Sequence, residues 1–200
     1  LGRSLGHIRQ RKPLVGVVGE IFVRMNTFSN QNVIEAIEAG GGEAWLSPMT
    51  EWLYYVWEDV ARKSGPLSSM KTSIKSRFLH MVERSIGALF SPLLDGREEP
   101  PLSQVISRGE HFVPMEFEGE AILTIGRAKL FAEQGAALVV NCSPFCCMPG
   151  RVTSYLFQKH PEYFKVPVVN LFFDGIGDVV SQVAIYLKSI TQEAEACSPL

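Results

Sequence analysis

Apolar residues follow two different periodicities along this chain, and the difference separates a sheet-forming part from a helical part. Short runs of β-branched and other apolar residues predict buried strands at residues 14–19, 44–47, 136–140 and 166–173. Apolar residues spaced three or four positions apart predict helices at residues 30–39, 118–133, 151–159 and 178–190. Ser29 is the expected cap of the first of these helices, and the three glycines at 40–42 are its expected end.

The middle of the chain, from about residue 51 to 114, has only helical periodicity. One helical stripe is formed by Leu53, Val56, Trp57 and Val60. A longer one is formed by Ile74, Phe78, Met81, Val82, Ile86, Leu89 and Leu93. The sequence Glu-Glu-Pro-Pro at 98–101 predicts a break after these helices.

Strand–helix alternation at both ends of the chain predicts an α/β fold. Right-handed crossovers favour a flavodoxin- or Rossmann-like parallel sheet in the order 2-1-3-4, with the helical insertion between strands 2 and 3. We expect a flexible N-terminal segment at 1–12, one α/β domain at 13–192 and a tail at 193–200. The chain starts at Leu1 rather than Met, and we expect it to be a piece of a longer protein.

Composition excludes several classes of protein. The formal net charge of −2 argues against nucleic-acid binding, which needs a basic excess to neutralise phosphates. No apolar run is long enough to span a bilayer, and the N-terminus lacks a signal-peptide core. Four cysteines in 200 residues do not form a disulfide scaffold. We therefore expect a cytoplasmic protein with reduced thiols or metal-bound cysteines, and no membrane partner.

Three of the four cysteines, Cys142, Cys146 and Cys147, cluster where the third strand is expected to end. Ligands of open α/β sheets bind beyond the carboxyl ends of the strands, so this position suits a metal site. The C-x3-C-C spacing is neither a zinc pair nor a ferredoxin run. Small apolar thiols that pack beneath the loop remain an alternative for each of the three. The fourth, Cys197, lies in the polar tail and is given no role.

Polar residues also follow the first and fourth strands. Glu20 and Asn30 could bind a polar ligand or a phosphate, and Asp174 follows the fourth strand. Asn30, like Ser29, could instead only cap a helix. Because the carboxyl ends of parallel strands share one edge, we expect Glu20, the 142–147 loop and Asp174 to line one crevice.

Four cations give the long middle helix a positive side: Lys71, Lys75, Arg77 and Arg84. Such a run is usually a solvated face, but it could dock an acidic partner or a coenzyme A phosphate. The four histidines form no ligand pattern, and no Ser-His-Asp or Cys-His pairing is evident.

Several segments together resemble the 2-hydroxyacyl-CoA dehydratase component family. They are the sequence V-V-G-E-I-F-V-R at 17–24, F-S-N at 28–30, S-P at 47–48, E-W at 51–52, G-E-A-I at 119–122, P-F-C-C-M-P-G at 144–150 and D-G at 174–175. The chain is most similar to the dehydratase-like region of the large CoA-substrate-specific enzyme activases, in which actin-like ATPase domains are fused to such a region. The resemblance covers about residues 12–190.

The resemblance implies a [4Fe-4S] or double-cubane cluster held between flavodoxin-like domains. It also implies an actin-like ATPase activator that supplies low-potential electrons, and a 2-hydroxyacyl-CoA substrate that loses water. The family's cysteine before Met-Pro-Gly corresponds to Cys147, whereas the position of Cys146 is usually not a cysteine. No cysteine precedes Cys142. We therefore expect the isolated domain to be inactive and to lack a cluster.

Three functions are consistent with these observations. The first is an iron–sulfur-binding, electron-transfer domain that donates Cys147 to a cluster shared with other domains of a parent protein of anaerobic metabolism. The second is a non-catalytic module that binds an acyl-CoA or a protein and has structural cysteines. The third, a thiol-based redox enzyme, lacks a C-x-x-C motif and a general base.

Overall fold

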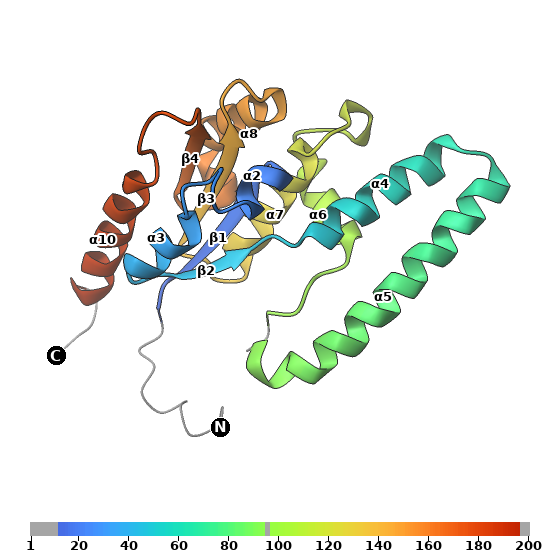
Figure 1. Cartoon of the computed structure of the whole chain (residues 1–200), viewed down its shortest axis with the longest axis horizontal. Helices are drawn as coiled ribbons and strands as arrows, with labels where there is room; N and C mark the ends of the chain where they lie inside the picture. Colours follow the sequence, from blue (N-terminus) through green and yellow to red (C-terminus); the bar gives the residue numbers. More distant parts are fainter. Residues whose placement is uncertain (1–11, 95–96, 197–200) are drawn as a thin grey trace. The chain divides into compact units, whose positions relative to one another are not determined.

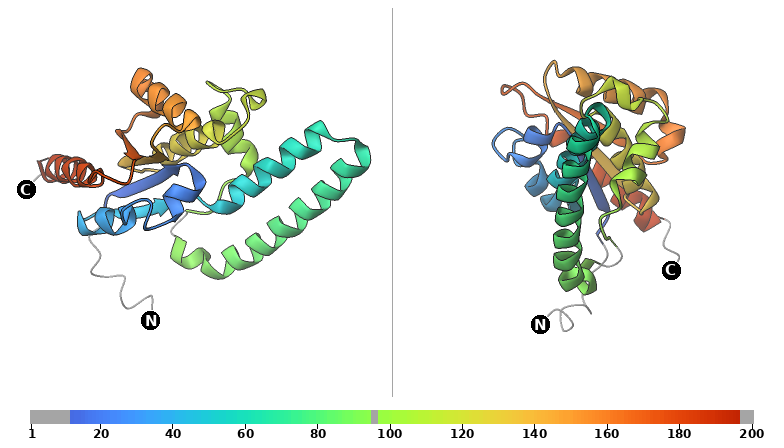
Figure 2. Two further views of the ribbon diagram at one scale, coloured as in Figure 1. Left: turned by 45° about the horizontal axis from the view of Figure 1, so that its top comes forward. Right: turned by 90° about the vertical axis from the view of Figure 1, so that its right-hand side faces the viewer.

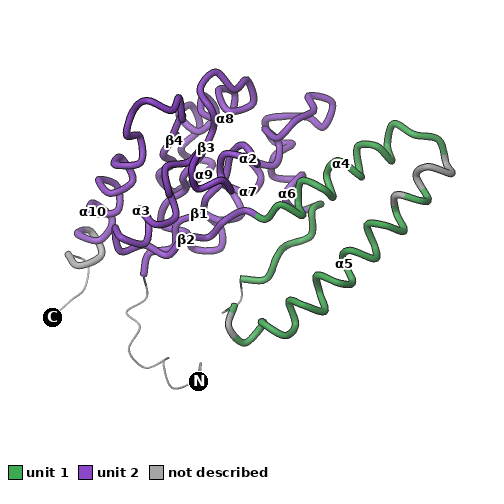
Figure 3. Tube along the Cα trace, in the orientation of Figure 1, with its two compact units in different colours: residues 1–8, 48–103 green, residues 9–47, 104–200 purple. Residues whose placement is uncertain are grey.

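The computed structural model describes residues 12–94 and 97–196, and the chain divides into two compact units (Figure 3). Unit 1 includes residues 48–103 and unit 2 includes residues 9–47 and 104–200. Most of the segment expected at 1–12, and Cys197 in the expected tail, lie outside the described residues.

Unit 2 is built around a four-stranded parallel sheet in the order β2-β1-β3-β4, which confirms the predicted α/β class and topology (Figure 1). The strands are β1 (Leu14–Gly19), β2 (Glu43–Leu46), β3 (Leu138–Pro144) and β4 (Val168–Phe173). The helices of unit 2 are α2 (Ile21–Met25), α3 (Val33–Ala39), the 3-10 turn η1 (Met115–Phe117), α7 (Ala121–Glu133), α8 (Met148–Lys159), α9 (Pro161–Phe164) and α10 (Ser181–Ala196).

Helices cover both faces of the sheet (Figures 1 and 2). On one face, Val33 and Ile37 of α3 and Val183 and Leu187 of α10 join a fully buried core with strand residues such as Val140. On the other face lie α7 and α8. Side chains alternate between the two faces along a strand, so successive residues of β3 belong to different layers.

The third strand continues four residues past its predicted end at 140. Asn141 and Ser143 are polar but buried, on the side of the sheet that α8 covers. The Asn141 amide donates to Thr153 Oγ1 of α8 at 3.3 Å and to Asn170 Oδ1 of β4 at 2.8 Å. These bonds satisfy the Asn141 amide nitrogen, whereas Asn141 Oδ1 and Ser143 Oγ have no hydrogen-bond partner among the described residues. Cys142 is therefore a strand residue and not, as expected, part of a loop.

The first long helix of unit 2 begins at Val33, three residues later than predicted, and Ser29 is not its cap. Gln31 and Asn32 have left-handed backbone, with φ of 53° and 56°, which excludes them from a right-handed helix. The sequence reasoning also missed the short helix α2. The later helices also differ from their predicted bounds: α7 and α10 begin three residues after the predicted start, and α8 begins three residues before it.

Unit 1 is a helical hairpin of α4 (Met49–Lys63) and α5 (Pro66–Leu94). Its helical character agrees with the predicted insertion, and residues 97–101 are not helical. The next helix, α6 (Leu102–Gly109), begins at the end of unit 1. Tyr54 of α4 stacks on His80 of α5 with ring centroids 3.9 Å apart, and its hydroxyl donates to Glu83 Oε2 at 2.5 Å. Burial and this bond raise the pKa of Tyr54, so the hydroxyl keeps its proton. In the described residues, no helix has the length and apolar character needed to cross a membrane.

Candidate functional site

The predicted site residues lie along the carboxyl edge of the sheet in unit 2. In the strand register, Gly19 of β1 is opposite Cys142 of β3, and Pro144 is opposite Phe173 of β4. The Glu20 N–H donates to the Cys142 carbonyl oxygen at 2.8 Å. The structure therefore brings the first residue after β1 next to β3, as parallel strands require.

The three cysteines differ in accessibility. Cys142 is fully buried in the core beneath α3 and α10, and burial raises the pKa of its thiol to about 12. Cys146 is exposed, with a left-handed backbone at φ 64°. Cys147 is half-buried and is the N-cap residue of α8. Core packing accounts for Cys142, whereas Cys146 and Cys147 remain within reach of a ligand.

Backbone hydrogen bonds hold Cys147 in place. Its N–H donates to the Pro144 carbonyl oxygen at 3.1 Å, and its own carbonyl oxygen accepts from the Arg151 N–H at 2.9 Å. Gly150 in the first turn packs so closely on Ser143 that a Cβ there would lie 2.6 Å from Ser143 Oγ. Strand, tight turn and helix thus position this thiol. Within the described ranges, no three His, Cys, Asp or Glu side chains come together as a metal site.

Glu20 begins α2 and is bonded to its backbone. Its Oε1 accepts from the Phe22 N–H at 3.1 Å and its Oε2 from the Val23 N–H at 2.8 Å. A second carboxylate, Glu120 from the start of α7, accepts from the Ile21 N–H at 3.0 Å. Burial, together with the charge of Glu20, raises the pKa of Glu120. Sequence reasoning missed Glu120 as a site residue because about one hundred positions separate it from α2.

Asn30 and Asp174 are also bonded to the main chain. Asn30 is buried, where its amide donates to the Arg24 carbonyl oxygen at 3.0 Å and its Oδ1 accepts from the Val33 N–H at 3.3 Å. Exposed Asp174 accepts from the Ile176 N–H at 2.9 Å, which lowers its pKa. The main chain thus engages both side chains, and Asn30 contacts the first N–H of α3, whose N-cap residue is Asn32.

Large apolar side chains surround this edge and are exposed, a feature that the periodicity of the chain did not reveal. They lie in the segments that follow β1, β3 and β4, including α2 and the start of α8: Phe22, Met25, Phe28, Phe145, Met148 and Ile176. Phe28 and Ile176 are the extremes, at 93% and 91% exposed. Solitary exposed apolar residues are ordinary, but a set gathered at one edge is typical of an interaction surface.

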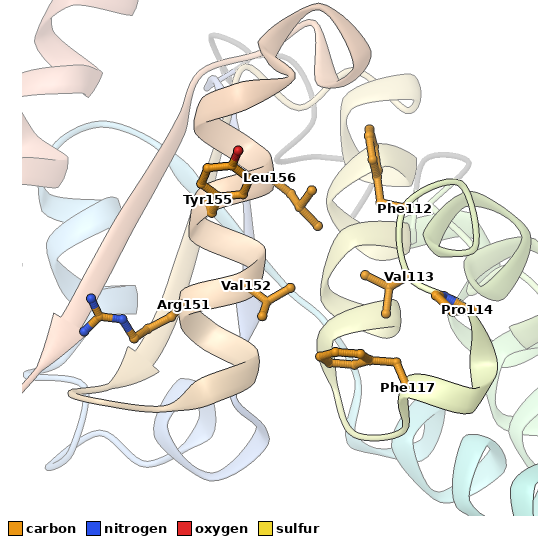
Figure 4. Close-up of a pocket in the computed structure, with 8 residues that line it drawn as sticks. All are labelled: Phe112, Val113, Pro114, Phe117, Arg151, Val152, Tyr155 and Leu156. Carbon is orange, nitrogen blue, oxygen red and sulfur yellow. The ribbon is translucent and has the colours of Figure 1, made fainter.

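A shallow apolar cavity of about 390 Å³ lies on the outer side of α8 (Figure 4). Val152 and Leu156 of α8 face Val113 and Phe117 across it, whereas the Arg151 side chain points away. None of the predicted site residues lines this cavity. This cavity is therefore not the crevice that was expected between Glu20, the 142–147 loop and Asp174.

Comparison with known proteins identifies no relative: no family model, no curated protein and no solved structure matches this chain.

Proposed function

We propose that unit 2 is an iron–sulfur-binding, electron-transfer domain that contributes Cys147 as one ligand to a cluster shared with other domains of a longer protein. The observation that carries this proposal is the position of Cys147. Its thiol is accessible, held by the turn between β3 and α8, and located at the sheet edge where α/β proteins bind ligands. The resemblance to 2-hydroxyacyl-CoA dehydratases and CoA enzyme activases assigns the cluster as [4Fe-4S] or double-cubane.

The donor set fits one part of such a site. Cubane clusters take about four protein ligands, usually thiolates. Cys147 supplies one, and exposed Cys146 is the candidate for a second. Cys142 stays neutral in the core and supplies none. When bound, the cluster would carry low-potential electrons. The positive end of the α8 helix dipole, at whose N-cap Cys147 lies, would favour negative charge on its sulfur.

The exposed apolar side chains at the same edge support a shared site. Phe145 and Met148 flank the two accessible cysteines in sequence, and both are more than half exposed. A second domain that covers them would bury apolar area and exclude water from the thiolates. Exclusion of water and hydrogen bonds to sulfur are what tune the potential of a cluster.

The resemblance extends the proposal beyond this chain. The parent protein would receive electrons from an actin-like ATPase activator in the cytoplasm and act on a 2-hydroxyacyl-CoA. This chain would be inactive alone and, prepared anaerobically, would contain no cubane cluster.

The test is a set of single serine variants in the full-length natural protein, purified without oxygen and assayed for iron, sulfide and reductase activity. Cys147→Ser should lose most of the iron and activity, whereas Cys146→Ser and Cys142→Ser should lose less. Circular dichroism controls for folding. If Cys147→Ser keeps the wild-type iron content, the cysteines are structural and the sheet edge is a binding surface for an acyl-CoA or a protein.

A further inference from the structure

The long helix α5 of unit 1 carries a line of large apolar side chains that remain exposed. Five of them share one face and are each more than half exposed: Met70, Ile74, Phe78, Met81 and Leu89; Ile86 and Phe90 are also more than half exposed but lie on the side of Glu83. The central residues of this line, Ile74, Phe78 and Met81, have helical spacing, and the small residues Ser85 and Ala88 continue the same line toward the C-terminus of α5. His80 and Glu83, which contact Tyr54 of α4, lie on the other side of α5. The hairpin therefore leaves an apolar stripe without a covering element.

Cations border this stripe on both sides. Arg77 and Arg84 follow one border and Lys75 lies on the other, whereas Lys71, seven residues before Phe78, stands at the end of the stripe itself. All four are exposed, and none of them forms an ion pair among the described residues. The single acidic residue of α5, Glu83, is occupied by the Tyr54 hydroxyl. A positive border with no acid of its own is complementary to negative charge.

A hollow beside the stripe offers room for acidic side chains. It has a volume of about 530 Å³ and is lined by Arg77, His80, Met81, Arg84, Ser85 and Ala88. Apolar and cationic groups thus meet within one hollow of unit 1, where a partner could place a carboxylate beside an apolar contact.

We propose that this α5 face, defined as Ile74, Phe78 and Met81 with the bordering Lys75, Arg77 and Arg84, binds an acidic amphipathic helix of a partner polypeptide. Ile74 and Met81 occupy the d positions of a heptad pattern and Phe78 an a position. The cations then fall on the e and g positions, which pair with charges of the opposite sign on a neighbouring helix. This inference is independent of the proposed cluster and would stand without it.

The alternatives fit the α5 face less well. A second copy of the chain would bring Arg77 and Arg84 against equally positive borders, which costs free energy. A helix that lies in a membrane surface has a broad apolar face, whereas this stripe is narrow and includes the small polar Ser85. Methionine at the centre of the stripe is typical of surfaces that adapt to a protein partner.

The experiment measures binding of two synthetic four-heptad peptides to the 200-residue chain by fluorescence anisotropy. Both peptides have Leu at a and d, and they differ only in having Glu or Lys at e and g. The acidic peptide should bind, with an affinity that falls as salt rises, and the basic peptide should not. Equal binding of both peptides, or of neither, would overturn the proposal.

Variants then locate the binding surface. Ile74→Gln with Met81→Gln, and separately Arg77→Gln with Arg84→Gln, should each weaken acidic-peptide binding by about tenfold or more. These side chains are exposed, so the fold should not change. The matched controls are Ile185→Gln, an exposed apolar residue of α10, and Lys159→Gln with Lys165→Gln, which remove the same charge from unit 2.

Three results would contradict the assignment. Control variants that weaken binding as much as the α5 variants would indicate non-specific attraction. If the chain binds phosphatidylserine vesicles but not the peptides, and the α5 variants lose vesicle binding, the α5 face binds a membrane surface. If the chain forms a dimer, and Ile74→Gln with Met81→Gln abolishes the dimer, the occupant is a second copy of the chain.

Discussion

Replacement of Gly19 by alanine should destabilise unit 2 strongly, because this glycine lets β1 turn into the candidate site. Gly19 has φ +111°, which side chains rarely adopt. A Cβ built there would overlap the Cys142 carbonyl oxygen and would lie 2.7 Å from the Cys142 nitrogen. The main chain of β3 cannot yield as a flexible side chain could, so β1 and β3 would have to separate where Glu20 N–H bonds to Cys142 at 2.8 Å.

The expected cost has three sources. Backbone strain at positive φ contributes on the order of 1–3 kcal/mol. Steric displacement of the packed strand contributes about 1–3 kcal/mol. Loss of the Glu20–Cys142 hydrogen bond contributes about 1 kcal/mol. Together they amount to about 3–7 kcal/mol, a large part of the stability of a typical domain, which is roughly 5–15 kcal/mol.

Gly41→Ala is the matched control, because Gly41 also has positive φ, +87°, but a Cβ there would meet nothing within 4 Å. It should cost only the backbone strain, about 1 kcal/mol. Urea unfolding followed by circular dichroism measures both variants against the wild type. Equal losses in the two variants, or a wild-type midpoint for Gly19→Ala, would refute the argument that the close approach of β1 to β3 shapes this edge.

Three further changes test individual contacts. Glu120→Gln should raise the free energy of unfolding at pH 7, because it keeps an acceptor for the Ile21 N–H and removes a carboxylate whose pKa is raised in the fold. The gain should be less than about 1 kcal/mol, because solvent screens a half-buried carboxylate. That gain should vanish below pH 4, where Glu120 is protonated in both states, and thermal melts at the two pH values check it. Cys142 keeps its proton until about pH 12, whereas the unfolded thiol ionises near its ordinary pKa of 9.0. The contribution of Cys142 to the free energy of unfolding is complete below pH 9 and should decline above it by up to about 1.4 kcal/mol per pH unit. Urea titrations at alkaline pH should show a smaller decline of the free energy of unfolding in Cys142→Ala. Tyr54→Phe removes the hydrogen bond to Glu83, and a loss of about 1 kcal/mol should accelerate hydrogen exchange of the α4–α5 amides about fivefold, with unit 2 amides unchanged.

The parts of the fold that could be predicted are those that local pattern determines. The first strand was predicted at its observed bounds because β-branched residues form a continuous apolar run after Pro13. The order of the strands followed from chain-crossing rules that need only the sequence of elements. The break at residues 97–101 followed from two acidic residues and two prolines.

Other features depend on partners that are distant in sequence. The N-cap of the short helix α2 is the adjacent Glu20, but its first N–H, that of Ile21, donates to Glu120, which no local pattern indicates. The end of β3 is polar and buried, and the Asn141 amide there bonds to Thr153 and Asn170, which are distant in sequence. The apolar stripe of α5 was predicted as a stripe, but periodicity could not tell that it stays exposed. For the candidate site, the sequence predicted that Cys146 and Cys147 follow the third strand, but it could not separate Cys142, which is buried in that strand, from accessible Cys147.

The most direct test of the proposed role of Cys147 is its reactivity in the full-length protein, isolated anaerobically with its cluster. Iodoacetamide is applied before and after the cluster is removed by chelation, and mass spectrometry quantifies alkylation at each cysteine. We predict that Cys147 is protected in the loaded protein and alkylated once the cluster is removed, whereas buried Cys142 remains unmodified in both folded samples. If Cys147 is alkylated at the same rate with and without the cluster, it is not a ligand and the account of this site is wrong.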